Sequence, residues 1–171
     1  MTLEMLLSDM WVDYCKMNPD AAKIFASLEK EGEEVLNDHI ALRTFNHPKL
    51  GIASLERQFK EFGYIERGTY VFEEKKLFAK HYEHSDDSLP KIFISELLLE
   101  KVSPFVRDSL NSIADQVTPL QLASTKFSMM GRPWQMSHSL YSKLAQESEY
   151  ASWVAAWGFR PNHFTVNVNR L

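Results

Sequence analysis

The chain has 171 residues, of which 44% are hydrophobic and 12% aromatic, enough to build one folded domain around an apolar core. A formal net charge of −4, with lysine and arginine scattered along the chain, excludes the basic surface that a nucleic-acid backbone requires. There is one cysteine, Cys15, no basic leader and no apolar run of 18 residues. These features predict a cytoplasmic protein without a membrane partner.

Two helices are predicted in residues 1–36. Apolar residues recur at spacings of three and four between Leu3 and Tyr14, which places them on one helix face. Asn18-Pro19-Asp20 then supplies a helix cap, a proline in the first turn and an early acidic residue. A second helix is therefore expected to start at this point.

Residues 37–100 carry the pattern of a βαβββ module. From Asp38 the chain alternates, so that His39, Ala41 and Arg43 share one strand face and apolar residues occupy the other. The remaining elements of the module are a helix that follows Pro48 and ends at Gly63, and strands in 64–73, 77–84 and 91–98.

Residues 101–158 are predicted to be a helical insertion, which opens with the cap Ser103-Pro104. Residues 159–171 then read as the first strand of a second module. A complete second module would need a helix and three more strands, so a truncated chain is favoured over a strand completed by a partner chain or a false repeat. The expected fold is a single α+β domain, a βαβββ module with helical additions and an apparently truncated second module.

One short pattern occurs twice, as Asp38-His39-Ile40-Ala41-Leu42-Arg43 and as Asn162-His163-Phe164-Thr165-Val166-Asn167-Val168. Each copy places a histidine at the start of a strand. If the two strands are equivalent elements of two repeated modules, the symmetry of the fold brings His39 and His163 together. A single histidine on a strand is more often structural, but two converging imidazoles indicate a metal site.

The segments Asn37–Phe45 and Trp157–Thr165 resemble the DUF1338 family, which is similar to the vicinal oxygen chelate enzymes and includes 2-oxoadipate dioxygenase/decarboxylases. The resemblance implies a non-haem Fe(II) dioxygenase/decarboxylase that converts a 2-oxo acid such as 2-oxoadipate and O₂ into a 2-hydroxy acid. It also implies that His39 and His163 are iron ligands and that Arg43 binds a substrate carboxylate. The third ligand would be a glutamate in a second module beyond Leu171.

Coordination chemistry agrees with this implication. Two histidines and one carboxylate leave three adjacent positions on a metal, enough for a bidentate 2-oxo acid and O₂. Arg43 lies on the same strand face as His39, roughly 13 Å further along at about 3.3 Å per residue, and its fork can bind a carboxylate with two hydrogen bonds. An ion pair with an acidic residue is the competing interpretation of Arg43.

The remaining assignments concern other polar residues. Glu96, in the strand at 91–98, is a candidate substrate-binding residue of the pocket. Asp38 and Asn162 are not assigned as partners of the histidines, because neighbouring side chains on a strand diverge. His81 and His84 are interpreted as surface residues.

Two other functions stay open. One is a lyase or isomerase of glyoxalase type, which would use zinc, nickel or manganese in place of iron and consume no O₂. The other is a protein that binds a metal or a small acid without turnover. The sequence does not indicate the oligomeric state.

Overall fold

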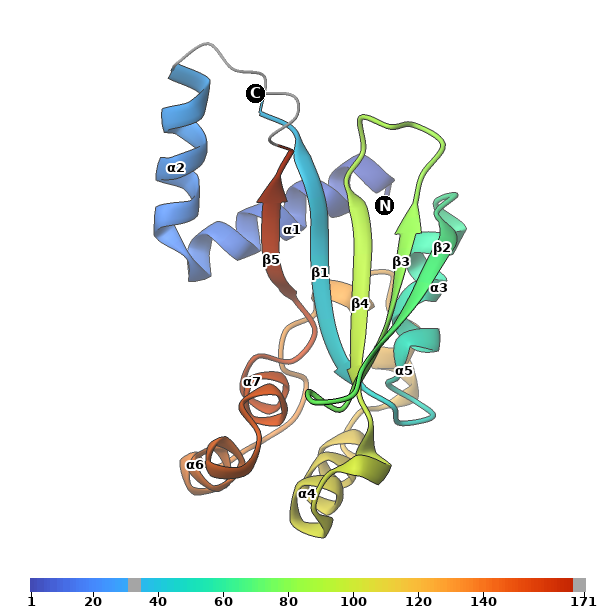
Figure 1. The fold of residues 1–171 in the computed structure, drawn as a ribbon, viewed down its shortest axis with the longest axis vertical. Coiled ribbons are helices and arrows are strands. Elements are labelled where there is room, and N and C mark those ends of the chain that lie inside the picture. Colours follow the sequence, from blue (N-terminus) through green and yellow to red (C-terminus); the bar gives the residue numbers. More distant parts are fainter. Residues whose placement is uncertain (31–34, 168–171) are drawn as a thin grey trace.

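The structure is a computed structural model that describes residues 1–30 and 35–167. Within these residues, five strands form one mixed sheet in the order β2-β3-β4-β1-β5, with helices behind it and at one end (Figure 1). The predicted α+β class and βαβββ module are therefore confirmed. The strands are β1 (Asn37–Phe45), β2 (Ile65–Phe72), β3 (Leu77–Glu83), β4 (Lys91–Leu97) and β5 (Pro161–Val166).

The helices begin where the sequence supplies caps. The hydroxyl of Ser103 accepts a hydrogen bond from the backbone N–H of Val106, and Pro104 follows in the first turn. The hydroxyl of Ser148 caps the helix that starts at Glu149, where it accepts from the backbone N–H of Ala151. The helices are α1 (Leu3–Met17), α2 (Pro19–Lys30), α3 (Ile52–Glu61), α4 (Pro104–Asp115), α5 (Pro119–Leu122), α6 (His138–Glu147) and α7 (Glu149–Trp157).

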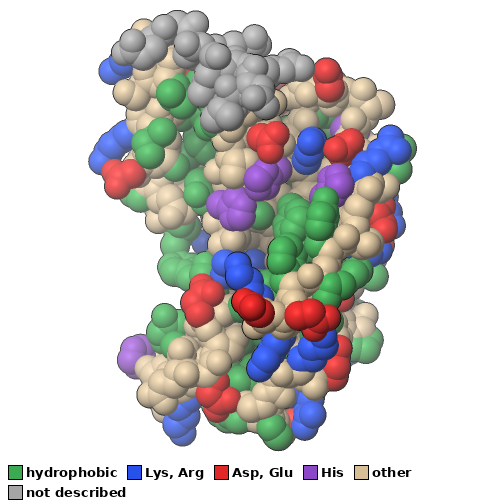
Figure 2. All heavy atoms as spheres, viewed as in Figure 1, with side chains coloured by type: hydrophobic (Ala, Val, Ile, Leu, Met, Phe, Trp, Pro, Cys, Tyr) green, Lys and Arg blue, Asp and Glu red, His purple; other side chains and the backbone are tan. Residues whose placement is uncertain are grey.

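The sheet has two unlike faces because its side chains alternate. Ile40 and Leu42 of β1 and Ile92 and Ile94 of β4 are buried in the hydrophobic core, on the side that α3 covers. The opposite face, called the pocket face below, carries His39 and other polar side chains. Figure 2 shows histidine side chains and an apolar patch gathered over this face. The pocket face is therefore the face of the sheet that a ligand can reach.

Strand β5 places the second histidine segment beside the first. It pairs with β1 in antiparallel fashion, with Ala41 opposite His163 and Ile40 opposite Phe164, whereas β1 pairs with β4 in parallel. The last residues of the predicted strand at 159–171, from 168 onward, lie outside the described residues. The division of the chain into an N-terminal part, a module, an insertion and a second module stays a prediction.

The helical insertion covers one end of the sheet. α4, α6 and α7 lie below the strands in Figure 1, and α7 leads directly into β5 through Gly158. This connection brings the first turn of α7 against the pocket face. No helix of the described residues is both long and apolar enough to cross a membrane.

Candidate functional site

His39 and His163 meet on the pocket face. Their Nε2 atoms are 3.3 Å apart, and their rings are nearly perpendicular, with centroids 5.3 Å apart. The two residues are 124 positions apart in the chain, so it is the β1–β5 pairing that joins them. The fold thus produces the convergence that the repeated pattern predicted, while metal binding by the pair stays a prediction.

The other ring nitrogen of each histidine has a polar partner from the preceding residue. His39 Nδ1 lies 2.9 Å from Asp38 Oδ2, and His163 Nδ1 lies 3.1 Å from Asn162 Oδ1. The expectation that these two neighbours point away is wrong. The β1–β5 pairing shifts register between Asn37 and Ile40 and again between Ala41 and Leu42, and such irregularities turn adjacent side chains toward each other.

These contacts favour a proton on the Nδ1 atom of each ring. An Nδ1 that donates to a carboxylate or an amide oxygen leaves Nε2 as a lone pair, which is the metal-binding form of histidine. Thr165 Oγ1 accepts from the His39 backbone N–H at 3.1 Å and also lies 2.8 Å from His39 Nδ1, so it is a second partner of that ring nitrogen. With both rings in this form, the two Nε2 lone pairs face each other at 3.3 Å, and a cation placed between them would relieve the repulsion.

The separation of the two nitrogens fits a shared metal ion. Imidazole binds divalent metals at about 2.1 Å, so two such bonds at a right angle place their nitrogens ~3.0 Å apart. The observed 3.3 Å is close to that value. Burial, together with His39 and Arg43 nearby, lowers the pKa of His163 and so favours the neutral ring that a metal requires.

The described residues supply only part of a ligand set. Among residues 1–30 and 35–167 no group of three histidine, cysteine, aspartate or glutamate side chains is placed to hold a metal ion. The carboxylate of Asp38 contacts the pair, but it lies against the Nδ1 atom of His39 and not against the Nε2 atom that would bind the metal.

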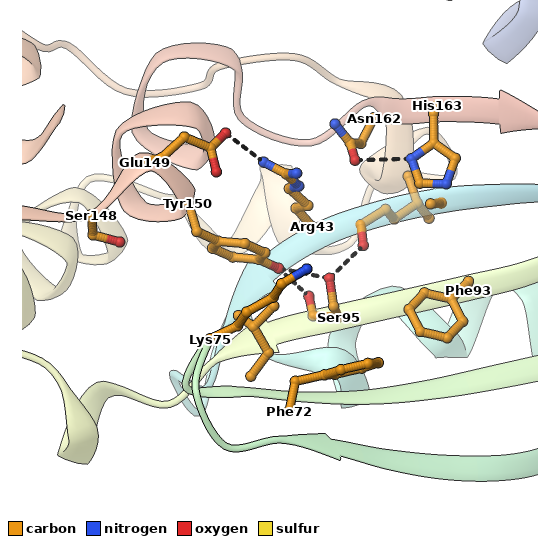
Figure 3. Close-up of a pocket in the computed structure, with 13 residues that line it drawn as sticks. Arg43, Phe72, Lys75, Phe93, Ser95, Ser148, Glu149, Tyr150, Asn162 and His163 are labelled. Atoms are coloured by element: carbon orange, nitrogen blue, oxygen red, sulfur yellow. Dashed lines mark hydrogen bonds and ion pairs between the residues drawn. The ribbon is translucent and has the colours of Figure 1, made fainter.

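Arg43 lies in a pocket of about 430 Å³ that also contains His163 (Figure 3). Its guanidinium carbon stands 4.9 Å from the ring centre of Tyr150 and 5.1 Å from that of Trp153. Both aromatic residues belong to α7, so the insertion holds the arginine by stacking. Nη1 of Arg43 also contacts Oε1 of Glu149 at 3.2 Å.

The two interpretations of Arg43 therefore coexist. Its observed partner is an acidic side chain, as the ion-pair interpretation expects. The side chain of Glu149 is 77% exposed, however, and an exposed ion pair of this kind contributes at most about 1 kcal/mol, so an incoming carboxylate can replace it. Apolar walls from Leu77, Phe72 and Phe93 complete the pocket. A substrate-binding role for Arg43 stays a prediction.

Glu96 lies on the other face of the sheet, away from Arg43 and the histidines. In the β1–β4 register it stands beside Thr44, whereas the pocket residue Ser95 stands beside Arg43. Its Oε2 accepts a hydrogen bond of 2.8 Å from the backbone N–H of Ile52, at the start of α3. The prediction of a pocket role is corrected: Glu96 caps a helix. Burial raises the pKa of its carboxyl, and the hydrogen bond from Ile52 opposes that rise in part.

Sequence reasoning missed His81 and Tyr70. Both line a second pocket of about 310 Å³ together with His39 and His163, and only 19% of the His81 side chain is exposed. His81 stands opposite Phe93 in the β3–β4 register, and Phe93 stands opposite Ala41, which shares the face of His39. The alternation of β3 was visible in the sequence, but its register against β4 was not. His84 lines neither of these two pockets.

Comparison with known proteins agrees with this geometry. The model of a family described as 2-oxoadipate dioxygenase/decarboxylase matches residues 5–171. A 2-oxoadipate dioxygenase/decarboxylase from Oryza sativa subsp. japonica, described as chloroplastic/amyloplastic, is 32% identical over 179 residues. That alignment covers 97% of this chain and 49% of the relative, so the chain spans about half the length of the curated relative it matches. The cytoplasmic location stays a prediction.

Solved structures extend the comparison. A candidate hydrolase from Shewanella frigidimarina is 48% identical with a TM-score of 0.93, over 98% of this chain and 66% of that one. Hydroxyglutarate synthase from Oryza sativa in complex with 2-oxoadipate is 32% identical with a TM-score of 0.87. The match covers 98% of this chain and 58% of that one. A glyoxalase superfamily protein from Ralstonia eutropha, at 22% identity and a TM-score of 0.79 over 95% and 61%, shares the fold.

Proposed function

Because this chain belongs to the 2-oxoadipate dioxygenase/decarboxylase family, we propose that it carries the metal and substrate site of an oxygenase for 2-oxo acids. The reaction is an oxidative decarboxylation with hydroxylation, in which one O₂ is consumed, one CO₂ leaves and a 2-hydroxy acid forms. With 2-oxoadipate, the ligand bound in the related Oryza structure, the product is 2-hydroxyglutarate.

The observation that carries the proposal is the histidine pair. Two Nε2 atoms face each other at 3.3 Å, while the Nδ1 atoms of both rings are held by Asp38 and Asn162. With a proton on one Nε2, the same two atoms would form a hydrogen bond between the rings, as in a structural histidine pair. Here the orienting partners favour a proton on each Nδ1, which suits a shared metal ion.

Fe(II) fits this donor set, with His39 and His163 as two ligands and a carboxylate outside the described residues as the third. Fe(II) in such a site supplies O₂ activation beside a chelated 2-oxo acid. Another divalent metal would keep the same two histidine ligands. The protein's own task is to hold both imidazoles correctly turned, which Asp38, Asn162 and Thr165 do.

Arg43 binds the far carboxylate of the substrate in this proposal. The pocket that contains Arg43 also contains His163, so a dicarboxylate held at the histidine pair can extend along the pocket to the guanidinium. Tyr150 and Trp153 stack on the guanidinium and keep its fork in place, while Glu149 is displaced into solvent. Phe72 and Phe93 enclose the methylene chain between the two ends.

Arg43→Gln is expected to raise the KM for 2-oxoadipate by roughly 10- to 100-fold, because a charged hydrogen-bonded contact is worth about 1.5–3 kcal/mol. The KM for 2-oxohexanoate, which lacks the second carboxylate, should change much less. Steady-state kinetics with both acids give the ratio of the two effects. Arg107→Gln, on the exposed surface of α4, is the matched control. An equal change of KM for both acids would contradict the assigned role.

The function itself is tested on the full-length protein, loaded with Fe(II) without air and then given O₂ and 2-oxoadipate. We expect equimolar O₂ consumption, CO₂ release and 2-hydroxyglutarate formation. Turnover of the acid without O₂ uptake would overturn the oxygenase proposal in favour of a glyoxalase-like reaction. Binding of metal and acid without any turnover would overturn it in favour of a binding protein.

A further inference from the structure

Three side chains on the outer strands of the sheet form a chain of polar contacts. The hydroxyl of Tyr70 lies 2.9 Å from His81 Nδ1, and His81 Nε2 lies 3.5 Å from Glu83 Oε1. A phenol, an imidazole and a carboxylate are thus in series. Tyr70 and His81 also line the pocket of about 310 Å³ that contains His39 and His163.

A glycine in β2 makes room for this chain. A Cβ atom at Gly68 would lie 2.9 Å from His81 Cε1, 3.0 Å from its Nδ1 and 3.3 Å from the Tyr70 hydroxyl. Gly68 also follows a register shift between β2 and β3. A glycine inside a strand is unfavourable by roughly 0.5–1 kcal/mol and marks a close approach of other atoms. Here the atoms that approach are those of the Tyr70–His81 contact.

The contact controls where the hydroxyl hydrogen of Tyr70 points. When Nδ1 of His81 carries a proton, it donates to the Tyr70 oxygen, and the hydroxyl hydrogen is then available to another acceptor. A proton on each ring nitrogen would let Nε2 donate to Glu83 Oε1 while Nδ1 donates to the Tyr70 oxygen. Lys91, whose Nζ lies 3.5 Å from Glu83 Oε1, adds a positive charge to the same pocket. This arrangement suits an anionic oxygen.

The two pockets of the sheet are two ends of one site, because Phe93 and His163 line both. Arg43 belongs to one end and Tyr70 to the other. An acid held at the histidine pair therefore has a guanidinium on one side and a phenol hydroxyl on the other. The rings of Phe72 and Phe93 pack beside the Tyr70 ring at centroid distances of 6.4 and 5.7 Å.

We propose that Tyr70 donates a hydrogen bond to an oxygen atom of the bound 2-oxo acid, and that His81 is the positioning residue that aims the Tyr70 hydroxyl. The proposal rests on the proposed function and assigns the end of the site that Arg43 does not reach. Tyr70 is 41% exposed, so burial alone gives its hydroxyl no need of a protein partner. That the hydroxyl of Tyr70 is nevertheless held by His81 fits a role in orienting it toward a ligand.

The test uses the Fe(II)-loaded full-length protein with 2-oxoadipate and O₂. Tyr70→Phe should lower kcat/KM by roughly 10- to 100-fold, the effect of one hydrogen bond to a charged group, while iron content stays at the wild-type level. His81→Phe should match it, and the double variant should be no worse than either single one. His81→Gln should recover part of the loss, since its amide can still donate to the Tyr70 oxygen. Gly68→Ala should lower kcat/KM with all three polar residues present.

Tyr141→Phe is the matched control, since Tyr141 packs beside His138 on α6, outside both pockets. If the wild type is active and Tyr70→Phe retains kcat/KM within twofold, this inference is overturned and the proposed function stands. Additive losses in the double variant, or loss of iron in Tyr70→Phe, would overturn it as well, because they indicate a structural role. If the wild type turns over no 2-oxo acid, the proposed function fails first and the inference fails with it.

Discussion

Replacing His39 or His163 with alanine is expected to weaken Fe(II) binding by more than about 100-fold and to abolish turnover. Loss of a partner that only orients a metal-bound histidine already costs roughly 10- to 100-fold in affinity, so loss of a ligand should cost more. The two variants should have similar effects, because each leaves one imidazole with an unpaired lone pair. Fe(II) titration without air, followed by metal analysis of the desalted protein, measures the loss.

Two checks make this result specific. The side chain of His39 is 33% exposed, so its removal leaves the core intact, and thermal unfolding should stay close to that of the wild type. His138→Ala, at the exposed start of α6, removes a histidine far from the pair and should bind iron normally. Wild-type iron affinity in both His39→Ala and His163→Ala would rule out the paired-histidine site.

The repeat and the strand alternation predicted the histidine pair because both patterns can be recognised within a short stretch of sequence. His39 and Arg43 are an even number of residues apart in β1, so their side chains lie on the same face of the strand. This does not depend on which strand lies beside β1. His163 required one further assumption, that β5 is the counterpart of β1. The antiparallel β1–β5 pairing does bring the two histidines together, while the assignment of β5 to a second module stays a prediction. Reasoning from the sequence therefore reached these three residues.

The other residues of the site depend on register and docking, which the sequence does not carry. Glu96 and Ser95 are neighbours in β4, and only the alignment of β4 with β1 decides which of them faces Arg43. The contacts of Asp38 and Asn162 arise at irregularities of the β1–β5 pairing. Glu149 and Tyr150 reach the pocket because α7 packs across the end of the sheet. Each of these features is a relation between distant segments.

Gly158→Ala is expected to lower the free energy of unfolding by about 3 kcal/mol or more. Gly158 has φ +69° and ψ −142°, a conformation that costs a residue with a side chain about 1–3 kcal/mol. A Cβ atom there would also lie 2.2 Å from the carbonyl oxygen of Gly131. The backbones of Gly131 and Phe159 exchange two hydrogen bonds of 2.8 Å, and relief of the clash would break them, at about 1 kcal/mol each.

Urea unfolding of wild type and variant measures this loss. Gly63→Ala is the matched control, because Gly63 also has a positive φ, of +91°, but a Cβ atom there would meet only the flexible side chain of His84. Its cost should be that of the backbone conformation alone, about 1–2 kcal/mol. Equal losses in the two variants would mean that the contact with Gly131 contributes nothing, contrary to this prediction.

The same substitution should also disturb the metal site. Gly158 joins α7 to β5, and Phe159 next to it is anchored in the core against Phe127 and Trp134, with ring centroids at 4.6 and 5.6 Å. His163 follows four residues later, so a shift of the Gly131–Phe159 bridge is transmitted along β5 to its imidazole. At a temperature where Gly158→Ala remains folded, its Fe(II) affinity should therefore fall below that of Gly63→Ala. Equal iron affinity in the two variants would mean that the β1–β5 pairing holds His163 without help from the bridge.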